Sequence, residues 1–359
     1  MSQTNWKLYT SNEEAWQAML ETCEKSRRSI DLEQFIFVAD DFGNKLIDIC
    51  AKKAKEGVKV RFIWDAAGSF TFFGTGIIEK LKSQGIELVF FKNLFPDFFD
   101  IHNYKSWYFR NHRRTLIIDN KIGFTGSICV YERMKNWRDT NIRIEGSSVD
   151  EMNNAFERMW NRAHKKKNIK EKRRIDTRSD FKYITNSPIP RHKYLYKSLI
   201  KAIEEARKYI YITTPYFSPT RKLLKTLKRA REKNVEVKII LPERTDYLIV
   251  DLAARTFFHT MLKSGVKIYL YKDEIIHSKT IIIDGEWSTV GTLNLDHISL
   301  LYNFEANIVS TDKKFAGELL EHFEKDISRA EEVTLAMWRK RYWVEKFAGF
   351  FIRFIRDLL

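Results

Sequence analysis

Short runs of β-branched, aromatic and aliphatic residues alternate along the chain with longer segments in which apolar residues recur every three or four positions. The short runs predict β-strands and the longer segments predict helices, because each spacing places apolar side chains on one face of its element. This alternation is typical of an α/β fold with a buried sheet. The predicted strands span residues 29–38, 58–64, 88–91, 209–213, 235–241 and 267–271.

The pattern of the first half recurs in the second half in the same order. Residues 54–63 resemble residues 231–240. Two further apolar runs, 115–118 and 280–283, each follow a histidine motif and are predicted to be buried strands. We therefore expect two duplicated α/β halves related by pseudo-twofold symmetry.

Changes in composition divide the chain into four parts. They are an N-terminal domain (1–164), a basic linker (165–190), a C-terminal domain (191–330) and a tail (331–359). The linker holds a dense run of lysine and arginine and ends in a Pro-Ile-Pro sequence. Such a run favours an exposed, solvated connection, and contact with lipid headgroups is the alternative.

Two segments are rich in aromatic residues. Residues 93–111 form an insertion before the first histidine motif and have no counterpart in the second half. They either pack on the core or meet a lipid or other substrate beside the site. Within the tail, residues 334–359 carry bulky apolar residues at helical spacing and cations on another face. This amphipathic pattern predicts an interfacial membrane helix, with docking on the protein's own core as the alternative.

Charge adds information about partners. The chain has 63 basic and 47 acidic residues in 359, a formal net charge of +16, with 44% hydrophobic residues. The hydrophobic content predicts a folded protein, and the positive charge favours phosphate-bearing partners, either nucleic acid or an anionic membrane surface. Charge alone does not choose between them.

The three cysteines, Cys23, Cys50 and Cys129, lie far apart and lack the spacing of a zinc site or a disulfide framework. We expect a reducing compartment and neither a metal nor another cofactor. The sequence shows no signal-peptide pattern and no apolar run long enough to cross a bilayer. Any membrane contact is therefore expected to be peripheral, and the oligomeric state is left open.

One polar motif occurs twice and carries the candidate chemistry. Each copy has a histidine, a cation two residues later, an aspartate, and a glycine followed by a hydroxyl residue. The first copy comprises His112, Arg114, Asp119, Gly126 and Ser127, and the second comprises His277, Lys279, Asp284, Gly291, Thr292 and Asn294. A single histidine would be weak evidence for a site, whereas two in one repeated pattern are not.

Pseudo-twofold symmetry would bring both histidines to one cleft, with Lys279 and Arg114 beside them. One imidazole could then attack phosphorus while the other, protonated, gives its proton to the leaving alcohol. The two cations would neutralise the phosphate oxygens. The hydroxyls of Ser127 and Thr292 and the amide of Asn294 would donate hydrogen bonds to the developing charge. This arrangement predicts cleavage and transfer of a phosphodiester without a metal.

A histidine in such a site needs an acid to fix its tautomer. Asp139 and Glu305 lie at nearly matching distances downstream of His112 and His277 and are the candidates. Asp119 and Asp284 fall at strand ends and are predicted to be structural.

The motifs identify the chain as a member of the phospholipase D superfamily, whose signature is two copies of His-x-Lys-x4-Asp-x6-Gly-Ser/Thr-x-Asn. The second copy matches throughout. Further segments, including Trp137-Arg138-Asp139-Thr140 and Asn303-Phe304-Glu305, most resemble bacterial cardiolipin synthases. The similarity extends over residues 6–327.

This resemblance implies two phospholipase D-like α-β-α sandwich halves. It implies transfer of a phosphatidyl group through a covalent phosphohistidine to the alcohol of a second phospholipid, with phosphatidylglycerol the expected substrate. It gives the nucleophile role to His112 and the acid/base role to His277. It also implies activity at the inner face of the cytoplasmic membrane. We expect this chain to bind there from the cytoplasm as a peripheral protein.

The first copy departs from the signature at two positions. Arg114 stands where the family has lysine, and Cys129 stands where it has asparagine. Guanidinium is not equivalent to ammonium. These departures keep two alternatives open, a phospholipase D or nuclease-type phosphodiesterase and a catalytically silent lipid-binding protein. The aromatic insertion and the tail argue against a nucleic-acid substrate.

Overall fold

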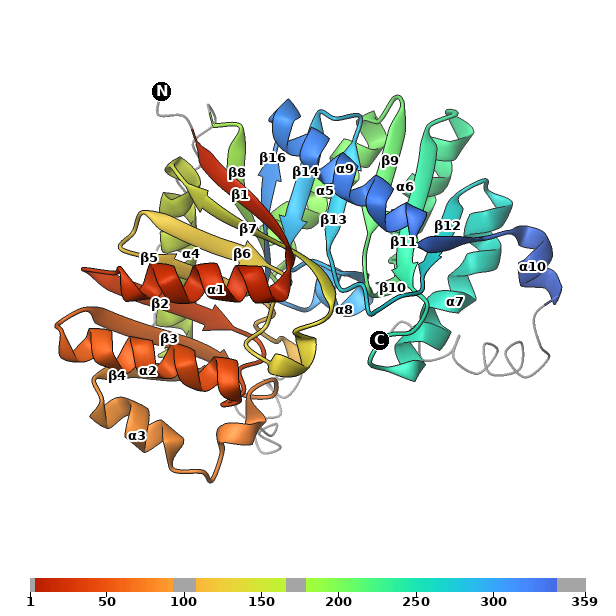
Figure 1. The fold of residues 1–359 in the computed structure, drawn as a ribbon. Coiled ribbons are helices and arrows are strands. Elements are labelled where there is room, and N and C mark those ends of the chain that lie inside the picture. The colour runs from red at the N-terminus through yellow and green to blue at the C-terminus, as the bar shows by residue number, and fades with distance from the viewer. Residues whose placement is uncertain (1–3, 93–107, 166–178, 341–359) are drawn as a thin grey trace.

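The computed structural model describes residues 4–92, 108–165 and 179–340 (Figure 1). Two halves lie side by side, and each is built on one large β-sheet flanked by helices. Most of the aromatic insertion and most of the amphipathic tail lie outside the described residues, so the predictions made for those parts stay predictions.

The first sheet has the strand order β1-β7-β6-β5-β2-β3-β4. Neighbours among β2, β3 and β4 are parallel, and the other neighbours are antiparallel. Helices α1 and α2 cover one face of this sheet and α4 covers the other. The elements are β1 (Asn5–Ser11), α1 (Asn12–Glu24), β2 (Ser29–Gln34), α2 (Asp41–Lys55), β3 (Lys59–Asp65), η1 (Phe70–Phe72), α3 (Ile77–Ser83), β4 (Ile86–Phe91), β5 (Thr115–Ile118), β6 (Ile122–Gly126), η3 (Glu132–Met134), β7 (Arg138–Glu145) and α4 (Ser147–Ala163).

The second sheet has the order β17-β12-β11-β9-β13-β14-β16-β8. Helices α5, α6 and α7 cover one face and α9 covers the other. The elements are β8 (Phe181–Asn186), η4 (Pro190–His192), α5 (Tyr194–Glu205), β9 (Tyr209–Thr213), β10 (Phe217–Ser218), α6 (Arg221–Glu232), β11 (Glu236–Pro242), α7 (Leu248–Lys263), β12 (Lys267–Tyr271), β13 (Thr280–Ile283), β14 (Trp287–Gly291), β15 (Leu295–Asp296), α8 (His297–Leu301), β16 (Glu305–Ser310), α9 (Lys313–Ser328), β17 (Ala330–Val333) and α10 (Leu335–Lys340). Strands β10 and β15 form a separate two-stranded sheet.

The seven strands of the first sheet have counterparts in the second. Read from its β8 end, the second sheet has the order β8-β16-β14-β13-β9-β11-β12, which corresponds to β1-β7-β6-β5-β2-β3-β4, and β17 is an additional edge strand. The predicted duplication is therefore confirmed. The correspondence also explains a difference from the sequence analysis: residues 181–186, placed there in the basic linker, form β8, the counterpart of β1, so the second unit begins with this edge strand.

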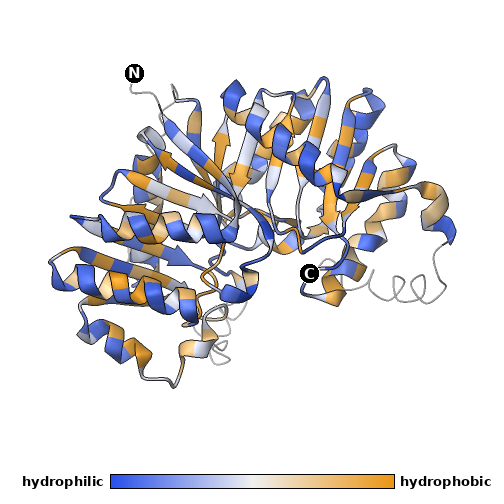
Figure 2. Ribbon diagram, viewed as in Figure 1, coloured by the Kyte–Doolittle hydropathy of each residue, from blue (hydrophilic) through white to orange (hydrophobic). Residues whose placement is uncertain are grey.

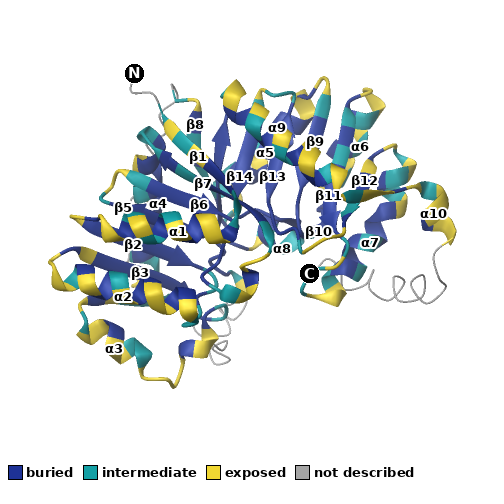
Figure 3. Cartoon of the chain, viewed as in Figure 1, coloured by how far each residue is buried: buried dark blue, intermediate teal, exposed yellow. Residues whose placement is uncertain are grey.

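The core consists of three clusters of buried apolar side chains. Two of them lie on the outer faces of the sheets, under α1 and α2 in the first half and under α5 to α7 in the second. The third joins the halves, because it combines residues of α4 with residues of α9, among them Phe156 and Phe323. Each fully buried aromatic side chain of this kind contributes about 1.5–3 kcal/mol, which favours a fixed arrangement of the halves. Figures 2 and 3 show the result as apolar, buried strands covered by helices whose outer faces are polar and exposed.

The segment after α9 continues the second half before the described residues end. Residues 330–333 form β17, which pairs with β12, so this domain extends past the boundary predicted at 330. In α10, Trp338 is buried, and its ring centroid lies 5.0 Å from that of Phe258 on α7. The described start of the tail thus docks on the protein core. Across the ranges described, no helix is both long and apolar enough to span a bilayer.

Candidate active site

Both histidine motifs begin at the same kind of sheet edge. Thr115 of β5 pairs with Glu33 near the end of β2, and Thr280 of β13 pairs with Thr213 at the end of β9. Since β2 and β9 are parallel to their neighbours β3 and β11, the motifs lie where parallel strands of each sheet end. Side chains at such edges are free of the sheet's own hydrogen-bond ladder and are common sites of chemistry.

Each histidine is held by the backbone of the opposite half. The N–H of His112 donates to the carbonyl of Phe304 at 3.0 Å, and the N–H of Phe304 donates to the carbonyl of Arg110 at 2.9 Å. In the other motif, the N–H of His277 donates to the carbonyl of Arg138 at 2.8 Å. The two halves therefore meet through short backbone bridges located at the histidines themselves.

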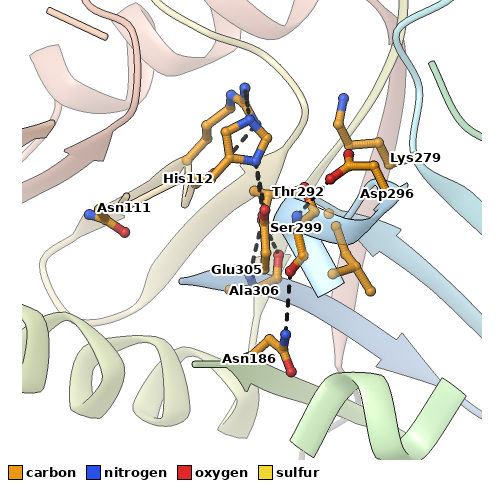
Figure 4. Close-up of polar contacts among 12 residues, drawn as sticks. Asn111, His112, Asn186, Lys279, Thr292, Asp296, Ser299, Glu305 and Ala306 are labelled. Carbon is orange, nitrogen blue, oxygen red and sulfur yellow. Dashed lines mark hydrogen bonds and ion pairs between the residues drawn. The ribbon is translucent and has the colours of Figure 1, made fainter. Parts of the chain in front are cut away.

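The acids identified in the sequence lie against the histidines, and each comes from the opposite half. His112 Nδ1 is 2.9 Å from Glu305 Oε1, and His277 Nδ1 is 3.0 Å from Asp139 Oδ2. All four side chains are buried. Figure 4 shows Glu305 reaching up to His112. Sequence spacing had matched each acid to the histidine of its own half, whereas the structure shows that the pairs cross between the halves.

The cations contact the other nitrogen of each ring. Arg114 Nη2 lies 2.9 Å from His112 Nε2, and Lys279 Nζ lies 3.0 Å from His277 Nε2. A guanidinium has donors but no acceptor, so His112 Nε2 must accept this bond and carry no proton. The ring proton of His112 then lies on the Nδ1 side, between imidazole and Glu305. In this tautomer the Nε2 lone pair of His112 points to Arg114 and is the ring's free nucleophilic electron pair.

Burial and positive charge keep both imidazoles neutral. Burial, reinforced by the charges of Arg114 and Lys279, holds the pKa of His112 well below its usual range. Burial and the charge of Lys279 lower the pKa of His277 to about 4. Burial and the charge of Arg114 also lower the pKa of Lys279, to about 7. Burial raises the pKa of Glu305 to about 8, whereas the contact with His277 keeps the pKa of Asp139 below its usual range. Arg114 and Lys279 supply positive charge at the other nitrogen of each ring, which suits a phosphate ligand.

The two motif hydroxyls contact the two carboxylates. Thr292 Oγ1 donates to Glu305 Oε2 at 2.5 Å, and Ser127 hydrogen-bonds to Asp139 and donates to the carbonyl of Gly291 at 3.4 Å. Both residues are 0% exposed. Both hydroxyls therefore help to orient the two acids, and their role as phosphate donors stays a prediction.

The motif glycines allow a close approach that a larger residue would block. A Cβ atom at Gly126 would lie 2.2 Å from Asn141 Oδ1, and one at Gly291 would lie 2.3 Å from Asn307 Oδ1. The two asparagines accept backbone N–H bonds from the turns that follow the glycines. Sequence reasoning missed both asparagines, although each stands two residues after a histidine-binding acid, and this repeat could have identified them.

The motif aspartates support the backbone, as predicted. Asp119 accepts hydrogen bonds from the N–H groups of residues 27–29, and Asp284 accepts them from residues 207–209. Both aspartates have positive φ angles, 54° and 56°, at the turns after β5 and β13. They tie the far end of each motif strand to the start of its neighbouring strand.

The two halves differ at the cation and at the residue after the hydroxyl. Asn294 is 2% exposed, and its Oδ1 atom has no hydrogen-bond partner among the described residues. Its counterpart Cys129 is 0% exposed and accepts a bond from Arg114 Nε, with a distance of 2.9 Å from nitrogen to sulfur.

Aromatic rings line the histidines. Phe35 meets His112 edge to face, with ring centroids 4.9 Å apart. Trp137 and Tyr216 approach His277 at 5.3 and 6.3 Å. Sequence reasoning did not single out these rings as site residues. Within the described ranges, no cluster of three or more His, Cys, Asp or Glu side chains is arranged to hold a metal ion.

Comparison with known proteins places this geometry in a family. A family model described as "Cardiolipin synthase, PLD-like domain" matches residues 19–160 and 199–327. The probable cardiolipin synthase YwiE of Bacillus subtilis is 31% identical over all of this chain and 73% of its own length. A cardiolipin synthase of Oceanobacillus iheyensis is 32% identical, with 93% of this chain and 71% of that protein covered.

Solved structures agree on the fold. The phosphatidylserine synthase of Haemophilus influenzae superposes with a TM-score of 0.75 at 12% identity, covering 98% of this chain and 94% of that one. At this identity the likeness shows the fold alone. The family model and the relatives, which span both histidine motifs, show more: the chain belongs to the cardiolipin synthase family of phospholipase D-like enzymes.

Proposed function

We infer that this protein is a phosphatidyltransferase that moves a phosphatidyl group from one phospholipid to the alcohol of a second. The curated relatives are named cardiolipin synthases, and we propose the same activity here, with phosphatidylglycerol as substrate. The observation that supports it best is the crossed pairing of two buried histidines with two buried acids, His112 with Glu305 and His277 with Asp139.

In the first step, Nε2 of His112 attacks phosphorus of the donor lipid and forms a P–N bond. The P–O bond to the headgroup alcohol breaks, and that oxygen takes the Nε2 proton of His277. His277 must enter this step protonated, which a bound phosphodiester anion and the charge of Asp139 both favour. The step leaves a phosphatidyl group on His112 and a neutral His277.

In the second step, the hydroxyl of another phospholipid attacks phosphorus. Nε2 of His277 accepts the hydroxyl proton, the P–N bond breaks, and both histidines return to their starting states. Water in place of the lipid alcohol would give hydrolysis by the same route. Glu305 and Asp139 balance the positive charge that each ring carries during the cycle.

Arg114 and Lys279 have a separate role. Each now donates to an imidazole Nε2 atom, the atom that must reach phosphorus or the leaving oxygen. We expect both cations to transfer their hydrogen bonds to phosphate oxygens when substrate binds. They would then neutralise the charge that grows on phosphorus oxygens in each transition state.

The location proposed for this activity is the inner face of the cytoplasmic membrane, with peripheral binding. Exposed apolar residues support it. Phe70 and Phe73 follow β3, and Tyr247, Leu248 and Ile249 follow β11, the counterpart of β3. Both segments lie at the sheet edges where the histidine motifs begin, toward the lower side of Figure 1. Two such apolar segments beside the site, one in each half, would suit contact with a bilayer surface.

The test is a lipid-product assay by mass spectrometry. Wild type, His112→Ala and His277→Ala are incubated with phosphatidylglycerol vesicles, with and without phosphatidylethanolamine. We expect a four-chain phospholipid from wild type and none from either variant. His259→Ala, which changes an exposed histidine on α7, is the matched control and should retain activity.

Other products would contradict the proposal in distinct ways. Phosphatidic acid without a four-chain lipid would indicate a phospholipase. Salt-sensitive cleavage of DNA in the absence of lipid would indicate a nuclease. Vesicle binding without any turnover would indicate a silent lipid-binding protein.

A further inference from the structure

The departures from the family signature in the first half contact each other. Arg114 replaces a lysine and Cys129 replaces an asparagine, and the two side chains meet at 2.9 Å between Nε and Sγ. The second half keeps the lysine and the asparagine, as Lys279 and Asn294. The same molecule therefore contains both versions of the pair in equivalent positions, which allows a direct comparison.

The guanidinium reproduces the contacts of the lysine with different atoms. Lys279 Nζ alone contacts both Nε2 and the carbonyl oxygen of His277, at 3.0 and 2.8 Å. Arg114 divides the equivalent contacts, with Nη2 at 2.9 Å from Nε2 and Nη1 at 3.4 Å from the carbonyl oxygen of His112. The third nitrogen of the guanidinium, Nε, has no counterpart in lysine. Because Arg114 is only 3% exposed, this N–H needs a protein acceptor.

Cys129 meets this need in both chemistry and size. Its sulfur accepts the Nε bond, although thiol sulfur is a weak acceptor. Its side chain also ends at the sulfur, whereas an asparagine would place two further atoms beyond that point, where the guanidinium lies. A lysine at 114 would leave this space partly empty. Each residue of the pair therefore fits the other better than it fits the family residue.

We propose that Cys129 is the positioning residue for Arg114, and that the two form a matched pair that holds the phosphate-binding cation of the first half in place. The proposal rests on the proposed function in one respect, that Arg114 binds the substrate phosphate. It implies that the departures preserve the site. With Nε held by sulfur, the planar guanidinium of Arg114 is held in one orientation, with its two terminal nitrogens toward His112, and a guanidinium can bind two oxygens of one phosphate through these nitrogens.

The test is a double-mutant cycle on phosphate affinity, measured by isothermal titration of the full chain with inorganic phosphate. Arg114→Lys and Cys129→Asn should each weaken phosphate binding by about tenfold. The double variant, which copies the second half, should lie within about threefold of wild type, because each change removes the misfit caused by the other. Additive losses, or no phosphate binding by wild type, would overturn the proposal.

Two smaller substitutions at Cys129 test the hydrogen-bond acceptor separately from the size of the side chain. They also keep the proposal testable if Cys129→Asn misfolds. Cys129→Ser keeps an acceptor and should bind phosphate more tightly than Cys129→Ala, which removes it. Equal affinity of these two variants would contradict the positioning role. Cys50→Ala removes an equally buried thiol from α2, outside the site, and should leave phosphate affinity unchanged.

Turnover of phosphatidylglycerol is followed in the same set of variants. Non-additive phosphate binding with no turnover in wild type would support the matched pair and reject the proposed function. Turnover in wild type with additive losses of phosphate affinity would support the proposed function and reject the matched pair.

Discussion

At the scale of single residues, the site is organised by where the protons lie. Arg114 can only donate, so the neutral His112 ring must hold its proton toward Glu305. Lys279 and Asp139 arrange His277 in the same way. The acids therefore act by fixing the tautomer and by stabilising the charged ring later in the reaction.

Replacing either acid by its amide tests this role. Glu305→Gln and Asp139→Asn keep the shape of the side chain but remove the charge that stabilises a protonated ring. We expect each variant to lose about 100-fold or more in kcat, the range typical of lost acid–base function, with little loss of thermal stability. The measurement is turnover of phosphatidylglycerol together with thermal unfolding. Unchanged turnover in either variant would contradict the assignment of that acid.

The low pKa of Lys279 predicts a pH dependence that a permanent cation should abolish. Burial and the neighbouring Arg114 charge lower this pKa to about 7, so the ammonium loses its proton as the pH rises through that value. If the charge is needed to bind phosphate, kcat/KM of wild type should fall above about pH 7. Lys279→Arg should move this fall to higher pH, because arginine stays charged. If kcat/KM falls at the same pH in wild type and in Lys279→Arg, another group is responsible for the pH dependence.

Much of the site could be predicted from the sequence because its motif is local. The histidines, cations and aspartates stand at fixed spacings around one strand, so the repeat alone identifies them. The acids were found by symmetry, but their crossed pairing depends on how the halves dock. The contacts of Thr292 and Ser127 with the two acids could not be predicted, since a spacing does not show which side of a carboxylate a hydroxyl occupies.

At the scale of elements, each motif strand is fixed at its far end by an aspartate. Asp119 holds the turn after β5 against the first residues of β2 through three backbone N–H groups. Burial alone would raise the pKa of this carboxyl, but these hydrogen bonds outweigh it and lower the pKa. The stabilisation is therefore fully present above the ordinary value of 3.8 and is lost as the pH falls through the lower folded value.

Asp119→Ala should lower the free energy of unfolding by about 1.5–3 kcal/mol, the usual effect of losing hydrogen bonds to a charged group. Asp119→Asn should cost less, because asparagine tolerates the positive φ angle and keeps one acceptor. Chemical denaturation at pH 7 measures both changes, and turnover per folded molecule should stay unchanged. A large loss of turnover at full stability would point to a catalytic role instead.

The strands that the sequence predicted are β2, β3, β4, β5, β9, β11, β12 and β13, and all of these except β4 lie inside their sheets. Continuous apolar runs mark β3, β5, β9, β11, β12 and β13, which are buried on both faces. Strands β6, β7, β14 and β16 were missed. They carry buried polar residues such as Asn141 and Asn307, whose side chains serve the active-site turns. Functional polar residues thus hide these strands from any search for apolar patterns.

At the scale of the whole molecule, neither half contains a complete site. Each histidine takes its acid and one backbone hydrogen bond from the other half. A further contact beside the site reinforces this docking, because Arg138 of β7 forms two hydrogen bonds with Asp326 of α9, both 2.8 Å long. The shared apolar core and these polar contacts together explain why the duplicated unit acts as a pair.

The outer edge of the paired site leads to a prediction about membrane binding. Leu248 and Phe70 are 73% and 59% exposed, at the starts of α7 and η1, which follow β11 and β3. If both segments enter a bilayer surface, Leu248→Glu and Phe70→Glu should each weaken binding to phosphatidylglycerol vesicles about tenfold, since each removes roughly 1.5 kcal/mol or more of apolar burial. Vesicle co-sedimentation at fixed salt measures the change. Met337→Glu, an equivalent change at an exposed position of α10 within the predicted membrane segment 334–359, tests the tail separately. Equal losses in all three variants would indicate a general charge effect, and a loss confined to Met337→Glu would place the contact at the tail.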